Sequence, residues 1–164
     1  MSASTMSDNV PPRVFLVVVD ETPEHRVAVR YAARRAAHTG GRVAMLYVVE
    51  PSELQHFQAI EELARTERWE AAEELLHALC DEIAPIAGSM PIVYIREGRS
   101  SDALLQLINE EPAISILVLA AGTGPEGPGP LITYLTTGRL AARLRIPITI
   151  VPGGLSLDQV EQLS

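Results

Sequence analysis

The sequence predicts an α/β fold with an open, parallel, five-stranded sheet and helices on both faces. Short continuous runs of β-branched and aliphatic residues indicate strands that are buried on both faces, as in a parallel sheet. Helical patterns separate these runs, and strands that alternate with helices form βα units with right-handed crossovers. With 164 residues, the chain is long enough to bury the core of one domain.

The chain begins with a polar lead and continues into the first strand and helix. Residues 1–12 are small and polar and are expected to be disordered, and the apolar run at residues 14–19 forms the first strand. The strand ends at Asp20. A helix then runs to about His38, with Thr22 as its cap, a proline in its first turn and two glycines after its end.

The middle of the chain supplies two more strands around a long helix. Residues 42–49 form the second strand and residues 91–95 the third. Residues 53–87 form a helix whose apolar stripe becomes clear from Ile60. The residues expected to be buried in this stripe are Leu63, Ala64, Ala72, Leu75, Leu76, Leu79 and Ile83.

The last part of the domain contains one more strand, helix and strand after a third helix. Ser100 or Ser101 caps the third helix, and residues 113–121 form the fourth strand. A loop rich in glycine and proline follows, then a helix over residues 134–144 and a fifth strand at residues 147–151.

One domain is expected over residues 13–152. The tail at residues 153–164 has apolar residues at helical spacing and is long enough for a short amphipathic helix. Such a helix could dock on its own domain or on a partner.

Composition excludes several classes of protein. The formal charge of −8 argues against a nucleic-acid partner, because binding to phosphates needs a basic surface. The single cysteine, Cys80, excludes a disulfide framework and fits a reducing compartment. No apolar run approaches the roughly 18 residues of a membrane span, and residues 1–12 lack the features of a secretion signal. We expect a cytoplasmic protein with no membrane partner.

Candidate ligand contacts follow from the expected sheet. Ligands of such sheets lie outside the carboxyl ends of the strands, where the strand order reverses. A carboxylate there suits a base or ribose, and glycine N–H groups suit phosphates. The candidate residues are Asp20, Val49, Gly98, Ala120, Gly122, Gly124, Gly127, Gly129, Thr136 and Thr137. The histidines have no metal-ligand spacing, so we expect no metal site.

The order of these segments resembles the universal stress protein family. The segments that carry the resemblance are residues 17–20, 43–51, 96–105, 116–138 and 146–152. The resemblance covers residues 13–152 and implies a Rossmann-like fold, close to that of adenine-nucleotide alpha hydrolases, with strand order 3-2-1-4-5. It also implies that Asp20 is the pocket aspartate and that the ligand is ATP or another adenine nucleotide, with or without Mg²⁺.

The loop departs from the signature of that family's nucleotide-binding members, which is Gly, two residues, Gly, nine residues and then Gly-Ser or Gly-Thr. Gly124 and Gly127 have the first spacing, but the final pair at residues 137–138 is Thr-Gly, in reversed order. Alignment from the preceding strand instead puts Ala120 and Thr123 at the two glycines. The prolines at 125, 128 and 130 have no N–H group to offer a phosphate.

Three hypotheses about function remain open. The first is a nucleotide-sensing universal stress protein. The second is a homodimeric interaction module that binds no nucleotide and pairs through the edge strand from Pro147 to Val151. An unidentified protein partner is also open. The third is an enzyme of a related nucleotide-binding fold, such as an electron-transfer flavoprotein-like or adenylating protein. The chain has no P-loop lysine sequence, and residues 98–164 contain no histidine or lysine, so we expect slow ATP hydrolysis at most.

Overall fold

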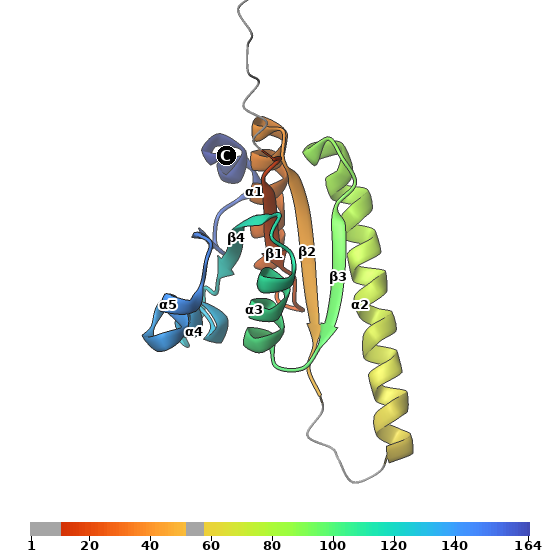
Figure 1. The fold of residues 1–164 in the computed structure, drawn as a ribbon. Coiled ribbons are helices and arrows are strands. Elements are labelled where there is room, and N and C mark those ends of the chain that lie inside the picture. Colours follow the sequence, from red (N-terminus) through yellow and green to blue (C-terminus); the bar gives the residue numbers. More distant parts are fainter. Residues whose placement is uncertain (1–10, 52–57) are drawn as a thin grey trace, which may run out of the picture.

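The computed structural model describes residues 11–51 and 58–164, which form a parallel sheet between two layers of helices (Figure 1). The strands are β1 Val14–Val18, β2 Arg42–Val49, β3 Ile92–Glu97, β4 Ile114–Ala121 and β5 Ile148–Pro152. The helices are α1 His25–Thr39, α2 Gln58–Ala87, α3 Ser100–Glu110, α4 Pro130–Thr136, α5 Gly138–Arg143 and α6 Leu157–Leu163. Residues 1–10 of the expected lead and residues 53–57 of the expected long helix lie outside the described residues.

The sheet has the order β3-β2-β1-β4-β5, and all four strand pairs are parallel. The predicted fold class and strand order are therefore confirmed. The chain passes from β1 to β2 and β3 through α1 and α2, then crosses to β4 through α3. The strand order reverses between β1 and β4, which is the place where such sheets bind ligands.

β1 forms the centre of the hydrophobic core. Phe15 and Val17 face α1 and α2 in one hydrophobic cluster, while Val14 and Leu16 face α3 and α4 in the other. None of these four side chains is more than 6% exposed. Burial on both faces explains why the strand is a continuous apolar run rather than an alternating one.

The long helix α2 extends past the sheet. The prediction of a buried side chain is confirmed for Ala72, Leu76, Leu79 and Ile83, whereas Ala64 and Leu75 are half-buried. The prediction for Leu63 was wrong, because that side chain is 62% exposed. The first turns of α2 project beyond the carboxyl end of β3, so they have no sheet to pack against (Figure 1). Within residues 11–51 and 58–164, no helix is both long and apolar enough to cross a membrane.

Two expected helix caps were also wrong. α1 begins at His25 after Glu24, and the backbone N–H and hydroxyl of Thr22 donate to the Asp20 carboxylate instead. The N-cap of α3 is Arg99, whose side chain makes no cap hydrogen bond.

A carboxylate from the end of β2 takes the place of the expected serine cap on α3. The backbone N–H and hydroxyl of Ser100 both donate to Glu50 Oε1, at 3.3 and 2.8 Å. These bonds satisfy one of the N–H groups that the first turn of a helix leaves without an intrahelical acceptor. The partner lies 50 residues away in sequence, so local capping rules could not identify it.

The helix expected over residues 134–144 consists of two shorter helices. α4 begins at Pro130, where the fixed backbone angle of proline suits a first helical turn. Thr137 then adopts an extended conformation, with φ −121° and ψ 149°, and separates α4 from α5.

The C-terminal helix α6 packs on α1. Ser156 and Gln159 form a capping box, in which each side chain accepts a hydrogen bond from the backbone N–H of the other residue. Val160 is fully buried in the cluster that contains α1. The tail therefore folds back on its own domain.

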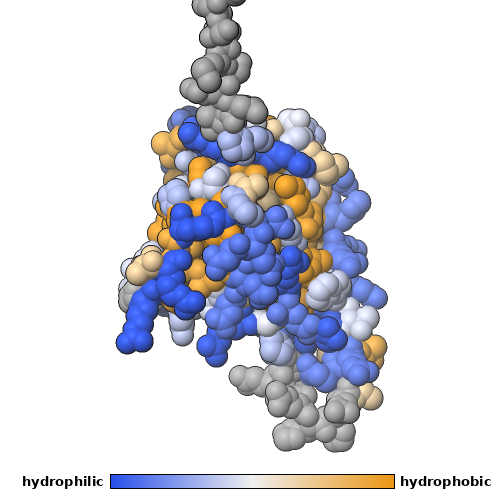
Figure 2. Space-filling view, in the orientation of Figure 1, coloured by the Kyte–Doolittle hydropathy of each residue, from blue (hydrophilic) through white to orange (hydrophobic). Residues whose placement is uncertain are grey.

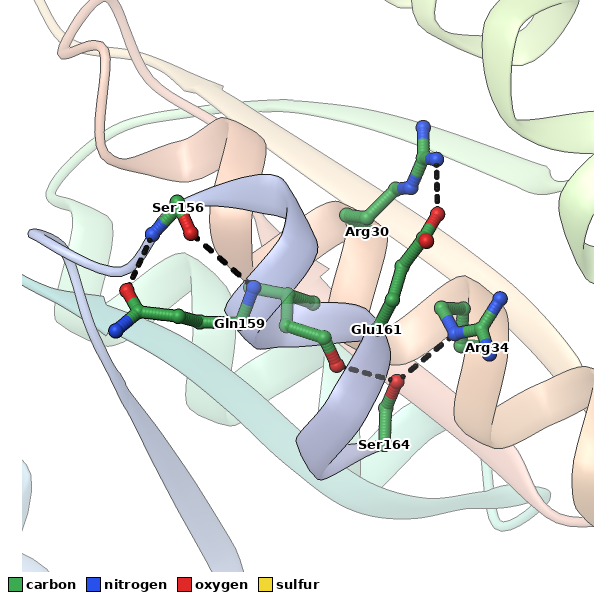
Figure 3. A network of polar contacts seen from close by, with 7 residues as sticks. Arg30, Arg34, Ser156, Gln159, Glu161 and Ser164 are labelled. Carbon is green, nitrogen blue, oxygen red and sulfur yellow. Dashed lines mark hydrogen bonds and ion pairs between the residues drawn. The ribbon is translucent and has the colours of Figure 1, made fainter.

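Polar contacts also join α6 to α1 (Figure 3). Arg30 on α1 pairs with Glu161 at 2.7 Å, and Arg34 donates to the Ser164 hydroxyl at 3.1 Å. The hydrogen bond from Arg30 lowers the pKa of Glu161. Exposed pairs of this kind contribute little to stability, so Val160 carries most of the docking energy.

We predict that Val160→Ala lowers the free energy of unfolding by about 2 kcal/mol, because it removes two buried methyl groups and leaves a cavity. Urea unfolding measures this change. Leu163→Ala on the same helix is the matched control: its side chain is 67% exposed, and its substitution should change stability by less than about 0.5 kcal/mol. Equal effects of the two substitutions would contradict the packing of α6 on α1.

Candidate functional site

A cavity of about 970 Å³ lies at the carboxyl ends of β1, β2 and β4. Its lining comes from the strand ends, the first turns of α1 and α3, and the loop at residues 122–130. Part of α2 also reaches it, through Arg68. The cavity therefore lies where the strand order reverses.

Most of the predicted contact residues line this cavity. Those that do are Asp20, Val49, Ala120, Gly122, Gly124, Gly127 and Gly129. Gly98, Thr136 and Thr137 are not among the lining residues. The structure thus brings the β1 carboxylate and the glycine loop together.

Gly98 has a backbone role instead. Its N–H donates to the carbonyl of Val49 at 3.0 Å, which extends the pairing of β2 and β3 by one bond. Its φ of +128° is a conformation that side chains disfavour. Glycine at this position therefore allows the chain to leave β3 and begin α3.

The two threonines turn their hydroxyls back onto α4. Thr136 Oγ1 donates to the carbonyl of Ile132 at 2.7 Å, and Thr137 Oγ1 donates to the carbonyl of Thr133 at 2.6 Å. Threonine hydroxyls on helices often donate a hydrogen bond to the backbone carbonyl four residues earlier. Sequence spacing alone could not show that these two groups were already used.

The turn at residues 20–25 presents hydrogen-bond acceptors at the cavity. Asp20 Oδ1 accepts hydrogen bonds from the backbone N–H of Thr22, at 2.8 Å, and from its hydroxyl. The carbonyl of Thr22 in turn lies 2.6 Å from Nδ1 of His25. Asp20 is exposed, so its carboxylate is held in place and still accessible.

The 122–130 loop closes on itself. The N–H of Gly122 donates to the carbonyl of Pro128 at 2.9 Å, and the N–H of Gly127 donates to the carbonyl of Gly124 at 3.2 Å. Two glycine donors that the sequence suggested for phosphates are therefore used within the loop. Gly127 and Gly129 have positive φ angles of 95° and 114°, as this tight path requires.

Acidic groups outnumber basic ones in the lining. The carboxylates are those of Asp20, Glu21, Glu24, Glu50 and Glu126, and the guanidinium groups are those of Arg68 and Arg99. Five negative and two positive charges give a formal charge of −3 when His25 is neutral. The carboxyl ends of β2 and β3 point toward the lower part of the view in Figure 1. In the same orientation, Figure 2 shows mostly hydrophilic residues over that lower part of the surface.

Sequence reasoning missed several lining residues. Glu50 lies in the segment 49–51 that the carboxyl-end rule selects, although only Val49 of that segment was among the candidate contact residues. Arg68 gave no such signal, because it lies within α2 and not at the end of a strand. His25 also gave none, since a lone histidine at a helix start has no ligand spacing.

Tyr47 on β2 provides an aromatic ring at the cavity. Its hydroxyl donates to Glu21 Oε1 over a long distance of 3.4 Å. Burial raises the pKa of Tyr47, and the neighbouring Glu21 carboxylate raises it further. The phenol therefore remains a neutral hydrogen-bond donor at physiological pH.

The described residues contain no group of three or more histidine, cysteine, aspartate or glutamate side chains that could hold a metal ion. The carboxylates that line the cavity thus do not form a cluster of that kind. A divalent cation would need further ligands from a bound molecule.

Comparison with known proteins agrees with the fold. The model of the Universal stress protein family matches residues 12–152. No curated protein matches the chain in sequence.

Solved structures of low sequence identity share the fold. The universal stress protein UspA from Lactobacillus plantarum has a TM-score of 0.73 and 17% identity, over 87% of this chain and 99% of that one. The universal stress protein from Archaeoglobus fulgidus in complex with dAMP has a TM-score of 0.56 and 16% identity, over 86% and 98%. A family member from Arabidopsis thaliana with AMP bound has a TM-score of 0.59 and 15% identity, over 87% and 92%.

We predict that Tyr47 ionises above its ordinary pKa of 10.0. Because the folded pKa is raised, the unfolded chain loses this proton first. The stabilising contribution of Tyr47 is complete below pH 10 and is lost as the pH rises through the folded pKa. The difference between the tyrosinate absorbance titrations of the wild type and Tyr47→Phe measures the pKa.

Glu21→Gln tests the second cause of this shift. The substitution should lower the pKa of Tyr47 but leave it above 10.0, because burial is the larger cause. A Tyr47 pKa at or below 10.0 in the wild type would contradict the described environment of the ring.

Proposed function

Because this chain belongs to the universal stress protein family, we propose that its cavity binds an adenine nucleotide as a regulatory signal. The observation that carries the proposal is the cavity of about 970 Å³ at the reversal of strand order, with the Asp20 carboxylate on its wall. This volume suits a small organic ligand. Structures of the same fold with dAMP and with AMP support the choice of ligand.

The lining offers two kinds of charged group, which suit different parts of a nucleotide. Carboxylates such as those of Asp20 and Glu21 accept hydrogen bonds, so they suit ribose hydroxyls or an amino group. Guanidinium groups bind phosphate with two parallel hydrogen bonds, so Arg68 and Arg99 suit the phosphate end. Tyr47 offers an aromatic face to the base.

Arg68 is available for such a contact. Its Nη2 lies 3.4 Å from Glu61 Oε1, which is a long ion pair, and its buried Nε has no hydrogen-bond partner among the described residues. A phosphate would satisfy these donors better than Glu61 does.

In this proposal a monophosphate binds better than a free triphosphate. The formal charge of −3 on the lining repels each added phosphate, and Gly122 and Gly127 have already used their N–H donors. Mg²⁺ would arrive with ATP, since it prefers phosphate oxygens, water and one or two carboxylates. Binding then acts as a signal by stabilising the ligand-bound conformation. We propose no catalytic residue.

We infer a homodimer as a second candidate role, because β5 is an edge strand of the described sheet. Ile150 on this strand is 43% exposed, and an apolar edge strand favours pairing with a second copy across a two-fold axis. The free cysteine Cys80 fits a cytoplasmic location for such an assembly. An unidentified protein could take the place of the second copy.

We predict that AMP binds and raises the melting temperature, while ATP without Mg²⁺ binds more weakly and gains affinity when Mg²⁺ is added. Asp20→Ala should weaken AMP binding about tenfold, the effect of losing a charged hydrogen bond. Isothermal titration calorimetry and thermal unfolding measure these changes. The absence of any response to adenosine, AMP or ATP, and of any co-purifying nucleotide in the native mass, would refute the proposal.

An arginine substitution tests the orientation of the ligand. Arg99→Ala should weaken AMP binding about tenfold but leave adenosine binding unchanged, because adenosine has no phosphate. Arg139→Ala, an exposed arginine outside the cavity lining, is the matched control. Equal losses for adenosine and AMP would place the phosphate elsewhere.

The dimer has its own test. Ile150→Lys places a charge on the exposed edge and should convert the dimer to a monomer in sedimentation equilibrium. Val93→Lys is the control and should leave the dimer intact. Val93 lies on β3, the other edge strand, and its side chain is 39% exposed. A monomeric wild type at all concentrations would exclude this role.

A further inference from the structure

The buried histidine at the start of α1 has one nitrogen that the protein itself does not use. His25 lines the cavity but is only 7% exposed. Its Nδ1 lies 2.6 Å from the carbonyl oxygen of Thr22. Its Nε2 is buried and has no hydrogen-bond partner among the described residues. Buried polar atoms without a partner are uncommon in folded proteins and call for an explanation.

The Thr22 carbonyl determines the chemistry of the free nitrogen. A carbonyl oxygen can only accept, so Nδ1 must carry the proton of this hydrogen bond. In a neutral imidazole with a protonated Nδ1, Nε2 is an acceptor. Neutral His25 therefore presents a lone pair at Nε2, and only a group with an N–H or O–H donor can satisfy it.

One short turn fixes both this nitrogen and the Asp20 carboxylate. Asp20 accepts from the N–H and hydroxyl of Thr22, and the carbonyl of Thr22 holds the imidazole of His25. Glu21 and Glu24 lie on the same turn and also line the cavity. The 20–25 turn thus supplies three carboxylates of the cavity wall and the buried Nε2 acceptor of His25, so it favours a ligand end rich in donors and repels a phosphate.

We propose that Nε2 of His25 accepts a hydrogen bond from a donor on the nucleoside end of the ligand and thereby determines which nucleosides bind. This inference rests on the proposed nucleotide binding and specifies its chemistry. The donor is either a ribose hydroxyl or the exocyclic amino group of the base. The phosphate end then contacts the guanidinium groups of the lining, those of Arg68 and Arg99.

His25→Asn is the sharpest variant for a test. Asparagine places an N–H donor where histidine has Nδ1, so the bond to Thr22 can persist, but it has no counterpart of Nε2. We expect AMP to bind about tenfold more weakly to this variant, the usual effect of losing one hydrogen bond. His77→Asn is the matched control, because the His77 side chain is 82% exposed, and it should bind AMP like the wild type.

Ligand analogues identify the donor. 2′-deoxy-AMP, 3′-deoxy-AMP and inosine monophosphate each lack one candidate donor. The analogue without the relevant donor should bind to the wild type about tenfold more weakly than AMP does. To His25→Asn it should bind no more weakly than AMP does, because the variant has already lost the same hydrogen bond. The proposal would be overturned if each of the three analogues lost as much affinity relative to AMP on His25→Asn as on the wild type.

Nitrogen NMR of the wild-type protein keeps the proposal testable if the variant fails to fold. The Nε2 resonance of His25 should be that of an unprotonated nitrogen and should move when AMP is added, while that of the exposed His77 stays fixed. A protonated Nε2, or one that AMP does not move, would overturn the proposal. If the wild type binds AMP but either result fails, only the role of His25 falls; if it binds no nucleotide, the proposed function falls with it.

Discussion

Because β1 lies at the centre of an all-parallel sheet, its side chains are buried on both faces and its backbone is paired on both edges. Every return from the end of one strand to the start of the next must then cross a face of the sheet, through a helix. The turns that leave the strands consequently gather at the carboxyl-terminal end of the sheet. The cavity at residues 20–25 and 122–130 is a result of this geometry, before any side chain contributes its chemistry.

The side chains then give the lining two kinds of group. The 20–25 turn supplies carboxylates and the lone pair of His25, while α2 and α3 supply the guanidinium groups of Arg68 and Arg99. In the proposed binding mode, these groups suit an asymmetric ligand that has hydroxyl or amino donors at one end and an anion at the other. A nucleoside monophosphate has that form, and it carries less of the negative charge that the lining repels.

The 122–130 loop has a different role from the one that its glycine content suggests. Gly122 and Gly127 donate to carbonyls within the loop, and the prolines have no N–H to donate. The loop is therefore a stiff wall, joined to the start of α1 by a long contact between Thr123 and Glu24 at 3.5 Å. Its glycines serve mainly to allow a tight path, which the positive φ angles of Gly127 and Gly129 show.

The sequence by itself determined the fold class, and its resemblance to a known family implied the strand order and hence the end of the sheet at which the cavity lies. Apolar runs and helical periodicity depend on residues that are close in the chain, and burial on both faces leaves a direct mark on composition. Tertiary structure alone decided which groups are free to bind. Glu50 caps a helix 50 residues away, Gly98 pairs with Val49, the overhang of α2 exposes Leu63, and α2 also brings Arg68 to the cavity. The reason is physical: a hydrogen-bonding group is available only if no other part of the fold has already satisfied it, and contacts between distant segments settle that question.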